Sequence, residues 1–173
     1  MLYVKSVVTK EGYKAPAEFA ASSVAKFTPT DEPSATWTWT CTAKTWSANE
    51  TKTINGKNWT LAGDGKYWGY DASKGQQLGS GNNPYKSMTL TTNFGDNYRV
   101  KTIKVNSCGG SKISATMTVS VGGTTLTPSS VSLTASATEY TFTTDTLLTG
   151  EIVISWTQQT TAKAIYLKSI TIN

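Results

Sequence analysis

The stretch GDGKYWGYDASKGQQLGSG, residues 63–81, places aromatic, carboxylate and amide side chains between closely spaced glycines. Sugar-binding sandwiches lay an exposed aromatic ring against the apolar face of a sugar, and amide or carboxylate groups bind its hydroxyls. The same residue types here predict a glycan-binding platform. Its candidate residues are Tyr67, Trp68, Tyr70, Asp71, Gln76 and Tyr85, with Asp64 and Gln77 as further polar partners. A second interpretation stays open, in which Trp68 and Tyr70 pack beneath the loop and the glycines only turn the chain.

The composition argues against catalysis. The sequence contains no histidine, so it lacks the usual general base near neutral pH and every Ser–His or Cys–His nucleophile pair. A glycosidase needs two carboxylates across a sugar, and no pair stands out among the 11 acidic residues. Asp64 and Asp71 match no calcium-binding loop and are better explained as residues of a solvated turn. We therefore expect no catalytic residues, no metal site and no cofactor.

The two cysteines, Cys41 and Cys108, are too few for a disulfide framework or a zinc site. Cys41 continues the alternation of Trp37 and Trp39, which predicts a buried free thiol. A single disulfide between the two cysteines remains the alternative.

The charge is positive but dispersed. The formal net charge is +5 and the sequence pI about 9.1, yet the lysines form no run, and the chain has one arginine, Arg99. Nucleic-acid readers concentrate lysine and arginine on one face, so we expect no specific nucleic-acid partner. No apolar stretch reaches the length of a transmembrane helix, so we expect no membrane insertion. Lys101 and Lys104 flank Ile103 and are interpreted as charges on an edge strand.

From Trp37 onward the hydrophobic pattern has a period of two, which is typical of half-buried strands. The segment ISATMTVSV, residues 113–121, alternates most clearly, and Gly122–Gly123 predicts a hairpin turn after it. The segment AIYLKSITI, residues 164–172, changes phase and predicts a bulge near Lys168–Ser169. Alternation also predicts buried tryptophans, with Trp46 left undecided: Trp37, Trp39, Trp59 and Trp156.

About eight to ten short strands separated by turn signals predict an all-β fold. We expect a two-sheet antiparallel sandwich over residues 37–173, with a jelly roll as the expected topology. Residues 1–36 differ, because their charges balance and Pro16, Pro29 and Pro33 interrupt them. Their few apolar groups cannot offset the entropy of ordering without a surface to lie on. We expect an N-terminal arm that docks on another chain or forms an oligomer through Leu2, Val4, Phe19 and Phe27.

Several segments resemble a known family. They are WSANETKTINGKNWTLAGDG, YWGYDASKGQQLGSGNNPYKSMTLTT, IKVNSCGGSKISATMTVSVGGT, TGEIVISWTQ and KAIYLKSITI. The resemblance is to the β-sandwich modules at the C-termini of secreted gut-bacterial proteins, including some extracellular nucleases. It implies a fold like that of carbohydrate-binding modules and no nuclease activity, since the catalytic domain of a nuclease is missing.

Two functions follow as hypotheses. The first is a non-enzymatic structural or adhesion protein of a phage virion, a head or tail decoration or fibre component docked by residues 1–36 onto other virion chains. It rests on the short arm that begins at Met1, where the relatives have a signal peptide or another domain. The alternative is a secreted or cell-surface carbohydrate-binding module of a larger bacterial protein. The first predicts the virion surface as the location, and the second an extracellular one; a cell-surface glycan is a partner in both.

Overall fold

The computed structural model describes residues 32–159 and 163–173. The predicted docking residues lie outside the described residues: Leu2, Val4, Phe19 and Phe27. The described part of the chain contains strands and no helix.

The strands are short and numerous because β-branched and aromatic residues alternate with threonine and serine throughout. The described residues form 13 strands: β1 (Trp37–Thr40), β2 (Thr51–Ile54), β3 (Lys57–Gly63), β4 (Trp68–Asp71), β5 (Gly75–Leu78), β6 (Ser87–Asn93), β7 (Val100–Gly109), β8 (Ala115–Val121), β9 (Thr124–Thr125), β10 (Val131–Ser132), β11 (Thr138–Leu148), β12 (Glu151–Gln158) and β13 (Ile165–Ile172).

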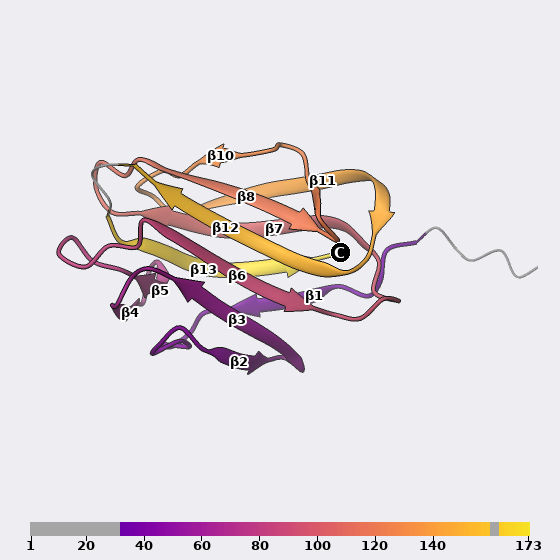
Figure 1. Cartoon of the computed structure of the whole chain (residues 1–173), viewed down its shortest axis with the longest axis horizontal. Helices are drawn as coiled ribbons and strands as arrows, with labels where there is room; N and C mark the ends of the chain where they lie inside the picture. The colour runs from indigo at the N-terminus through magenta and orange to yellow at the C-terminus, as the bar shows by residue number, and fades with distance from the viewer. Residues whose placement is uncertain (1–31, 160–162) are drawn as a thin grey trace, which may run out of the picture. The chain divides into compact units, whose positions relative to one another are not determined.

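The strands form two antiparallel sheets, which Figure 1 shows as layers one behind the other. Sheet A has the order β11-β7-β13-β5-β4, with β1 also paired to β13. Sheet B has the order β10-β8-β12-β6-β3-β2, with β9 paired to β8. From β6 onward the successive long strands β6, β7, β8, β11, β12 and β13 alternate between the two sheets, as in a double-sheet jelly roll. The predicted all-β sandwich is confirmed.

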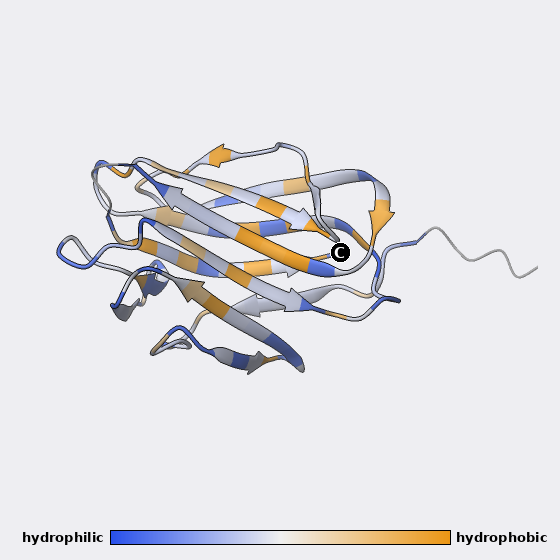
Figure 2. Ribbon diagram, viewed as in Figure 1, coloured by the Kyte–Doolittle hydropathy of each residue, from blue (hydrophilic) through white to orange (hydrophobic). Residues whose placement is uncertain are grey.

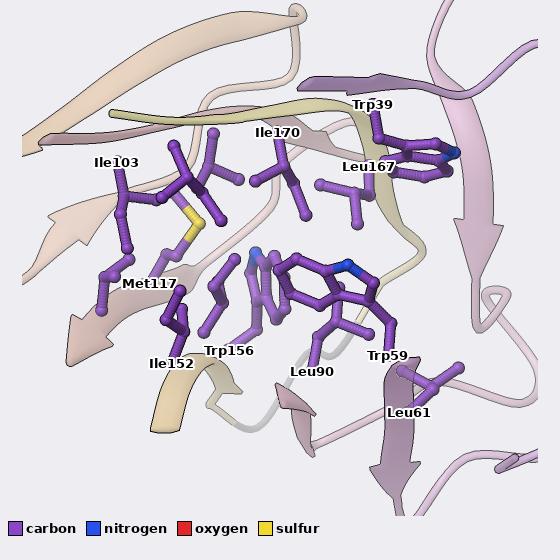
Figure 3. Close-up of a cluster of buried hydrophobic side chains, with 14 of the residues drawn as sticks. Trp39, Trp59, Leu61, Leu90, Ile103, Met117, Ile152, Trp156, Leu167 and Ile170 are labelled. Atoms are coloured by element: carbon purple, nitrogen blue, oxygen red, sulfur yellow. The ribbon is translucent and has the colours of Figure 1, made fainter. Parts of the chain in front are cut away.

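The core lies between the sheets. Figure 2 shows apolar and polar positions alternating along the strands, and Figure 3 shows side chains of both sheets meeting. Trp59 and Trp156 of sheet B are fully buried and face Leu167 and Ile170 of sheet A. Trp37 packs against Trp59 with ring centroids 5.2 Å apart, and Trp39 meets Trp46 edge to face at 5.5 Å. The undecided Trp46 therefore belongs to the core, 1% exposed, together with the four predicted tryptophans.

Two local predictions are confirmed. The register of β13 against β7 shifts between Leu167 and Ser169, which is the predicted bulge. Gly122 and Gly123 have φ angles of 56° and 81°, as a tight hairpin between β8 and β9 requires.

The edge assignment of Lys101 and Lys104 is wrong. Both lie on β7, which is paired on both sides because β11 covers the side away from β13. Lys101 donates to the carbonyl oxygen of Asp145, and Lys104 forms an ion pair of 3.2 Å with Glu139 on β11.

The chain enters the sandwich before β1. The Ser34 N–H donates to Arg99 O at 2.9 Å, and the Arg99 N–H donates to Ser34 Oγ at 2.8 Å. The Tyr98 hydroxyl donates to Ala35 O at 2.7 Å. Ser34 and Ala35, which fall within the predicted arm, are thus bound to the strand-connecting segment ahead of β7.

Gly75 begins β5 where this strand meets the bulge of β13. Its φ of +91° disfavours any side chain. A Cβ at this position would overlap the carbonyl oxygen of Leu167 and lie 2.8 Å from Lys168 Cα. The close approach of the two backbones therefore requires glycine.

We predict that Gly75→Ala destabilises the fold by at least about 2 kcal/mol, because it adds backbone strain to a steric overlap. Gly81→Ala is the matched control, since a Cβ there meets nothing within 4 Å and its φ is not positive. Urea unfolding followed by tryptophan fluorescence measures both. Equal midpoints for the two variants would contradict the close packing of β5 on β13.

Candidate functional site

The β4–β5 hairpin carries most of the predicted platform, and its turn is built by Asp71. Asp71 Oδ1 accepts hydrogen bonds from Ser73 N at 2.8 Å, Ser73 Oγ at 2.6 Å and Lys74 N at 3.0 Å. The Ser73 hydroxyl and these two amides lower the pKa of the Asp71 carboxyl below its ordinary value. Asp71 is therefore a charged turn residue at the end of β4.

The two exposed tyrosines, Tyr67 just before β4 and Tyr70 within it, are directed to opposite faces of the hairpin. In the register, Trp68 pairs with Leu78 and Tyr70 with Gln76, and both of these partners are buried between the sheets. Because side chains alternate along a strand, Trp68 and Tyr70 are directed to the core side, and Gly69 is on the outer face. A Cβ on Gly69 would lie 3.2 Å from Tyr67 Cε1, so the Tyr67 ring lies along the outer face.

Gln76 does not belong to an exposed site, because its side chain is fully buried. Its Oε1 accepts from Thr45 N at 2.7 Å and Trp46 N at 3.0 Å. Its Nε2 donates to Trp46 O at 3.2 Å and Gly69 O at 3.0 Å. The predicted ligand-binding role of Gln76 is therefore wrong: the amide joins the segment before β2 to the β4–β5 hairpin.

Tyr85 is also an interior residue, 0% exposed. Its hydroxyl donates to Asn49 Oδ1 at 3.0 Å, and burial raises its pKa to about 12. Trp68 packs edge to face against it, with ring centroids 6.4 Å apart. A Cβ on Gly63 or Gly65 would overlap the Tyr85 ring, so these glycines make room for that ring. The second interpretation of the loop thus fits Trp68, which packs partly buried against the core, whereas Tyr70 is 39% exposed.

The outer face of sheet A brings together a different set. Gln77 pairs with Gly69 on one side and with Tyr166 of β13 on the other. Tyr166 in turn pairs with Cys108 of β7. Directly opposite residues share a face, so Tyr67, Gln77 and Tyr166 lie in a row across three strands. We call the group Tyr67, Asp71, Lys74, Gln77 and Tyr166 the outer-face cluster.

The sequence prediction missed two members of this cluster, Lys74 and Tyr166. Tyr166 lies between the buried residues Ile165 and Leu167, so alternation already signals that it points outward. No sequence signal places β13 beside β5, because 86 residues lie between their paired residues Leu78 and Ile165.

Two lysines hold the β4–β5 turn against β13. Lys74 Nζ lies 5.0 Å from the centroid of the Tyr166 ring, a cation–π arrangement. Lys168, at the bulge of β13, donates from Nζ to Ala72 O at 2.8 Å. The turn that carries Asp71 and Lys74 is thus fixed from both sides.

Both cysteines are free thiols and buried, which settles the alternative left open by the sequence. Burial raises the pKa of Cys41 and of Cys108, and the Lys74 ammonium opposes this shift at Cys108. Neither thiol is a nucleophile at neutral pH under these conditions.

The rest of the described surface has no comparable group of aromatic and polar side chains on its strands. The outward positions of β8, β12, β6 and β3 in sheet B carry threonine, serine, asparagine, Glu151 and small apolar residues, and none of them is aromatic. The described residues contain no group of three or more His, Cys, Asp or Glu that could hold a metal ion. Within the same residues, no helix is long and apolar enough to cross a membrane.

Comparisons with known proteins give structural matches only. No family model matches the chain, and no curated protein matches it. A family two carbohydrate esterase from Cellvibrio japonicus is 13% identical over 80% of this chain and 33% of its own, with a TM-score of 0.46. The chain thus spans about a third of the esterase.

Carbohydrate-binding modules are also among the matches. A module named CBM36, solved with calcium and xylotriose, is 18% identical over 65% of this chain and 93% of its own, with a TM-score of 0.39. A low-affinity xylan-binding module, CBM86, from Roseburia intestinalis is 13% identical over 80% of this chain and 95% of its own, with a TM-score of 0.37. The assignment of this chain to the two-sheet sandwiches rests on its own strand pairing.

We predict that Gln76→Ala lowers the free energy of unfolding by about 2–4 kcal/mol, because it leaves buried backbone groups of Trp46 and Gly69 without partners. Gln77→Ala, the neighbouring residue on the outer face, should lower it by less than about 1 kcal/mol. Urea denaturation of the two variants compares them directly. A small loss for Gln76→Ala would contradict its assignment as a buried connector.

We predict that the native protein reacts slowly with Ellman's reagent at pH 7.5, because both thiols are buried and protonated. After unfolding in guanidinium chloride under non-reducing conditions, the two thiols should react at once. If the unfolded protein does not react, the two cysteines form a disulfide. Rapid reaction of the folded protein would contradict the burial of the two thiols.

Proposed function

We propose that this protein is a non-enzymatic glycan-binding module, and that the outer-face cluster is its binding face. One observation carries the proposal: Tyr67, 40% exposed, lies along the outer face beside Gln77 on a rigid sheet. An exposed ring on a flat face can stack on the apolar face of a sugar, as tyrosine has a large rigid surface and loses little entropy.

Polar groups surround this ring in the way that sugar recognition needs. Gln77 Oε1 lies 3.0 Å from where a Cβ on Gly69 would be, next to the Tyr67 ring. Gln77 Nε2 donates to Gly79 O at 3.0 Å, which fixes the orientation of the amide. The Asp71 carboxylate is held through Oδ1 by its own turn. An amide and a carboxylate positioned in advance bind hydroxyls with little further ordering.

The sequence contains no histidine, which is the most common general base in enzymes, and this supports a binding role over a catalytic one. The proposal places the module outside the cell or at a cell surface, where glycans are found. It makes the secreted carbohydrate-binding alternative the preferred function. The virion assignment stays a prediction, as do an arm at residues 1–36, a sandwich domain at residues 37–173 and an oligomer.

We predict that Tyr67→Ala weakens binding to a retained polysaccharide about tenfold or more, because it removes the stacking surface. Tyr70→Ala is the matched control: the side chain is the same, three residues further along the same hairpin and 39% exposed, but directed to the opposite face. Affinity gel electrophoresis against a panel of neutral and acidic polysaccharides measures both, and their melting temperatures should stay near that of the unaltered protein.

Two results would overturn the proposed site or the proposed function. Equal weakening by Tyr67→Ala and Tyr70→Ala would move the binding face away from the outer-face cluster. Retention by no polysaccharide of the panel would contradict glycan binding itself.

A further inference from the structure

The outer-face cluster holds a cation at a fixed place. Lys74 Nζ lies 5.0 Å from the centroid of the Tyr166 ring, so the ammonium is seated on the sheet. The ring belongs to the row that also contains Tyr67 and Gln77, and the Lys74 side chain is only partly buried. A lysine that already rests on a ring loses less side-chain entropy when it pairs with an anion.

The charges around this ammonium are mostly positive. Lys168 is a second cation at the same turn, where its Nζ donates to Ala72 O at 2.8 Å. Asp71 is the opposing charge, and its Oδ1 is occupied by Ser73 and Lys74 amides and the Ser73 hydroxyl. Two lysines, Lys74 and Lys168, against the one carboxylate of Asp71 give this turn a net positive charge.

The spacing of Tyr67 and Tyr166 across the sheet determines how long a ligand must be to contact both Tyr67 and the Lys74 ammonium. Tyr67 immediately precedes β4 and Tyr166 lies on β13, with β5 between these two strands. Two strand spacings of about 4.8 Å separate β4 from β13, so Tyr67 and the Tyr166 ring, on which the Lys74 ammonium rests, are about 10 Å apart across the sheet. A ligand that stacks on Tyr67 and reaches Lys74 must be longer than one sugar unit and must carry its anionic group beyond the stacked ring.

We infer that the outer-face cluster selects anionic oligosaccharides, with Tyr67 stacking on a sugar ring and Lys74 pairing with a carboxylate or sulfate on the same chain. This inference rests on the proposed glycan-binding function and adds the class of glycan. Carboxylate and sulfate share the chemistry that an ammonium recognises, since both offer charged oxygens to its N–H donors.

The test compares polygalacturonate with its carboxyl-reduced form, and heparin with its desulfated form, by isothermal titration calorimetry at 50 and 300 mM NaCl. We expect the charged member of at least one pair to bind at least about tenfold more tightly than its neutral or desulfated partner. Added salt should weaken that binding, because it screens the partly exposed ammonium.

Lysine variants distinguish specific pairing with Lys74 from non-specific attraction of an anionic glycan to a basic protein. Lys74→Gln should weaken binding of the charged polysaccharide about tenfold, and Lys74→Arg should retain most of it. Lys52→Gln is the control with the same loss of charge: it lies on β2 of the other sheet, in an exposed ion pair with Glu50. Its binding should match that of the unaltered protein.

Each of the other outcomes overturns either the selection of anionic glycans or glycan binding as well. Equal binding of charged and neutral polysaccharides, unaffected by Lys74→Gln, overturns the selection of anionic glycans and leaves glycan binding intact. Equal weakening by Lys74→Gln and Lys52→Gln, with Tyr67→Ala unaffected, indicates non-specific attraction and overturns both proposals. No binding of any polysaccharide also overturns both.

Discussion

Strand β13 is the constraint on which the rest of sheet A depends. One of its edges pairs with β7 along the strand, and the other is divided between β5 at Ile165–Leu167 and β1 at Ser169–Ile172. The bulge falls at this division. There the Lys168 carbonyl accepts the Cys41 N–H at 2.8 Å, and the Lys168 ammonium reaches Ala72 O. One irregular residue therefore positions the end of β1, the start of β5 and the turn above them.

A second connection, through a buried side chain, attaches the β4–β5 hairpin to the core. The buried amide of Gln76 binds backbone groups at Thr45, Trp46 and Gly69, so it ties the segment before β2 to β4 across the core. A buried amide is stabilising only when its donors and acceptors are satisfied, and here both ends are. The hairpin therefore behaves as part of the sandwich, although its sequence is that of a glycine-rich loop.

The same hairpin serves the core and the surface because side chains alternate along β4. Trp68 turns inward onto Tyr85, while Tyr67 and Gly69 belong to the outer face. The missing side chain at Gly69 leaves the space in which the Tyr67 ring lies. A binding face formed in this way is held by strand pairing, so a ligand would meet a surface that needs little reorganisation.

The sequence by itself determined the all-β class, the pairing of apolar faces, the core tryptophans and the bulge of β13, because these follow from the two-residue period of strands. It also determined the absence of histidine chemistry. Which strands are neighbours was decided by the tertiary structure, since pairing partners far apart in the chain leave no local signal. That pairing moved Gln76 and Tyr85 into the interior, directed Tyr67 and Tyr70 to opposite faces, and brought Tyr166 to Gln77 and Lys74. Composition could identify the residue types of a binding face, but only the packing of β4, β5 and β13 decided which of them share one.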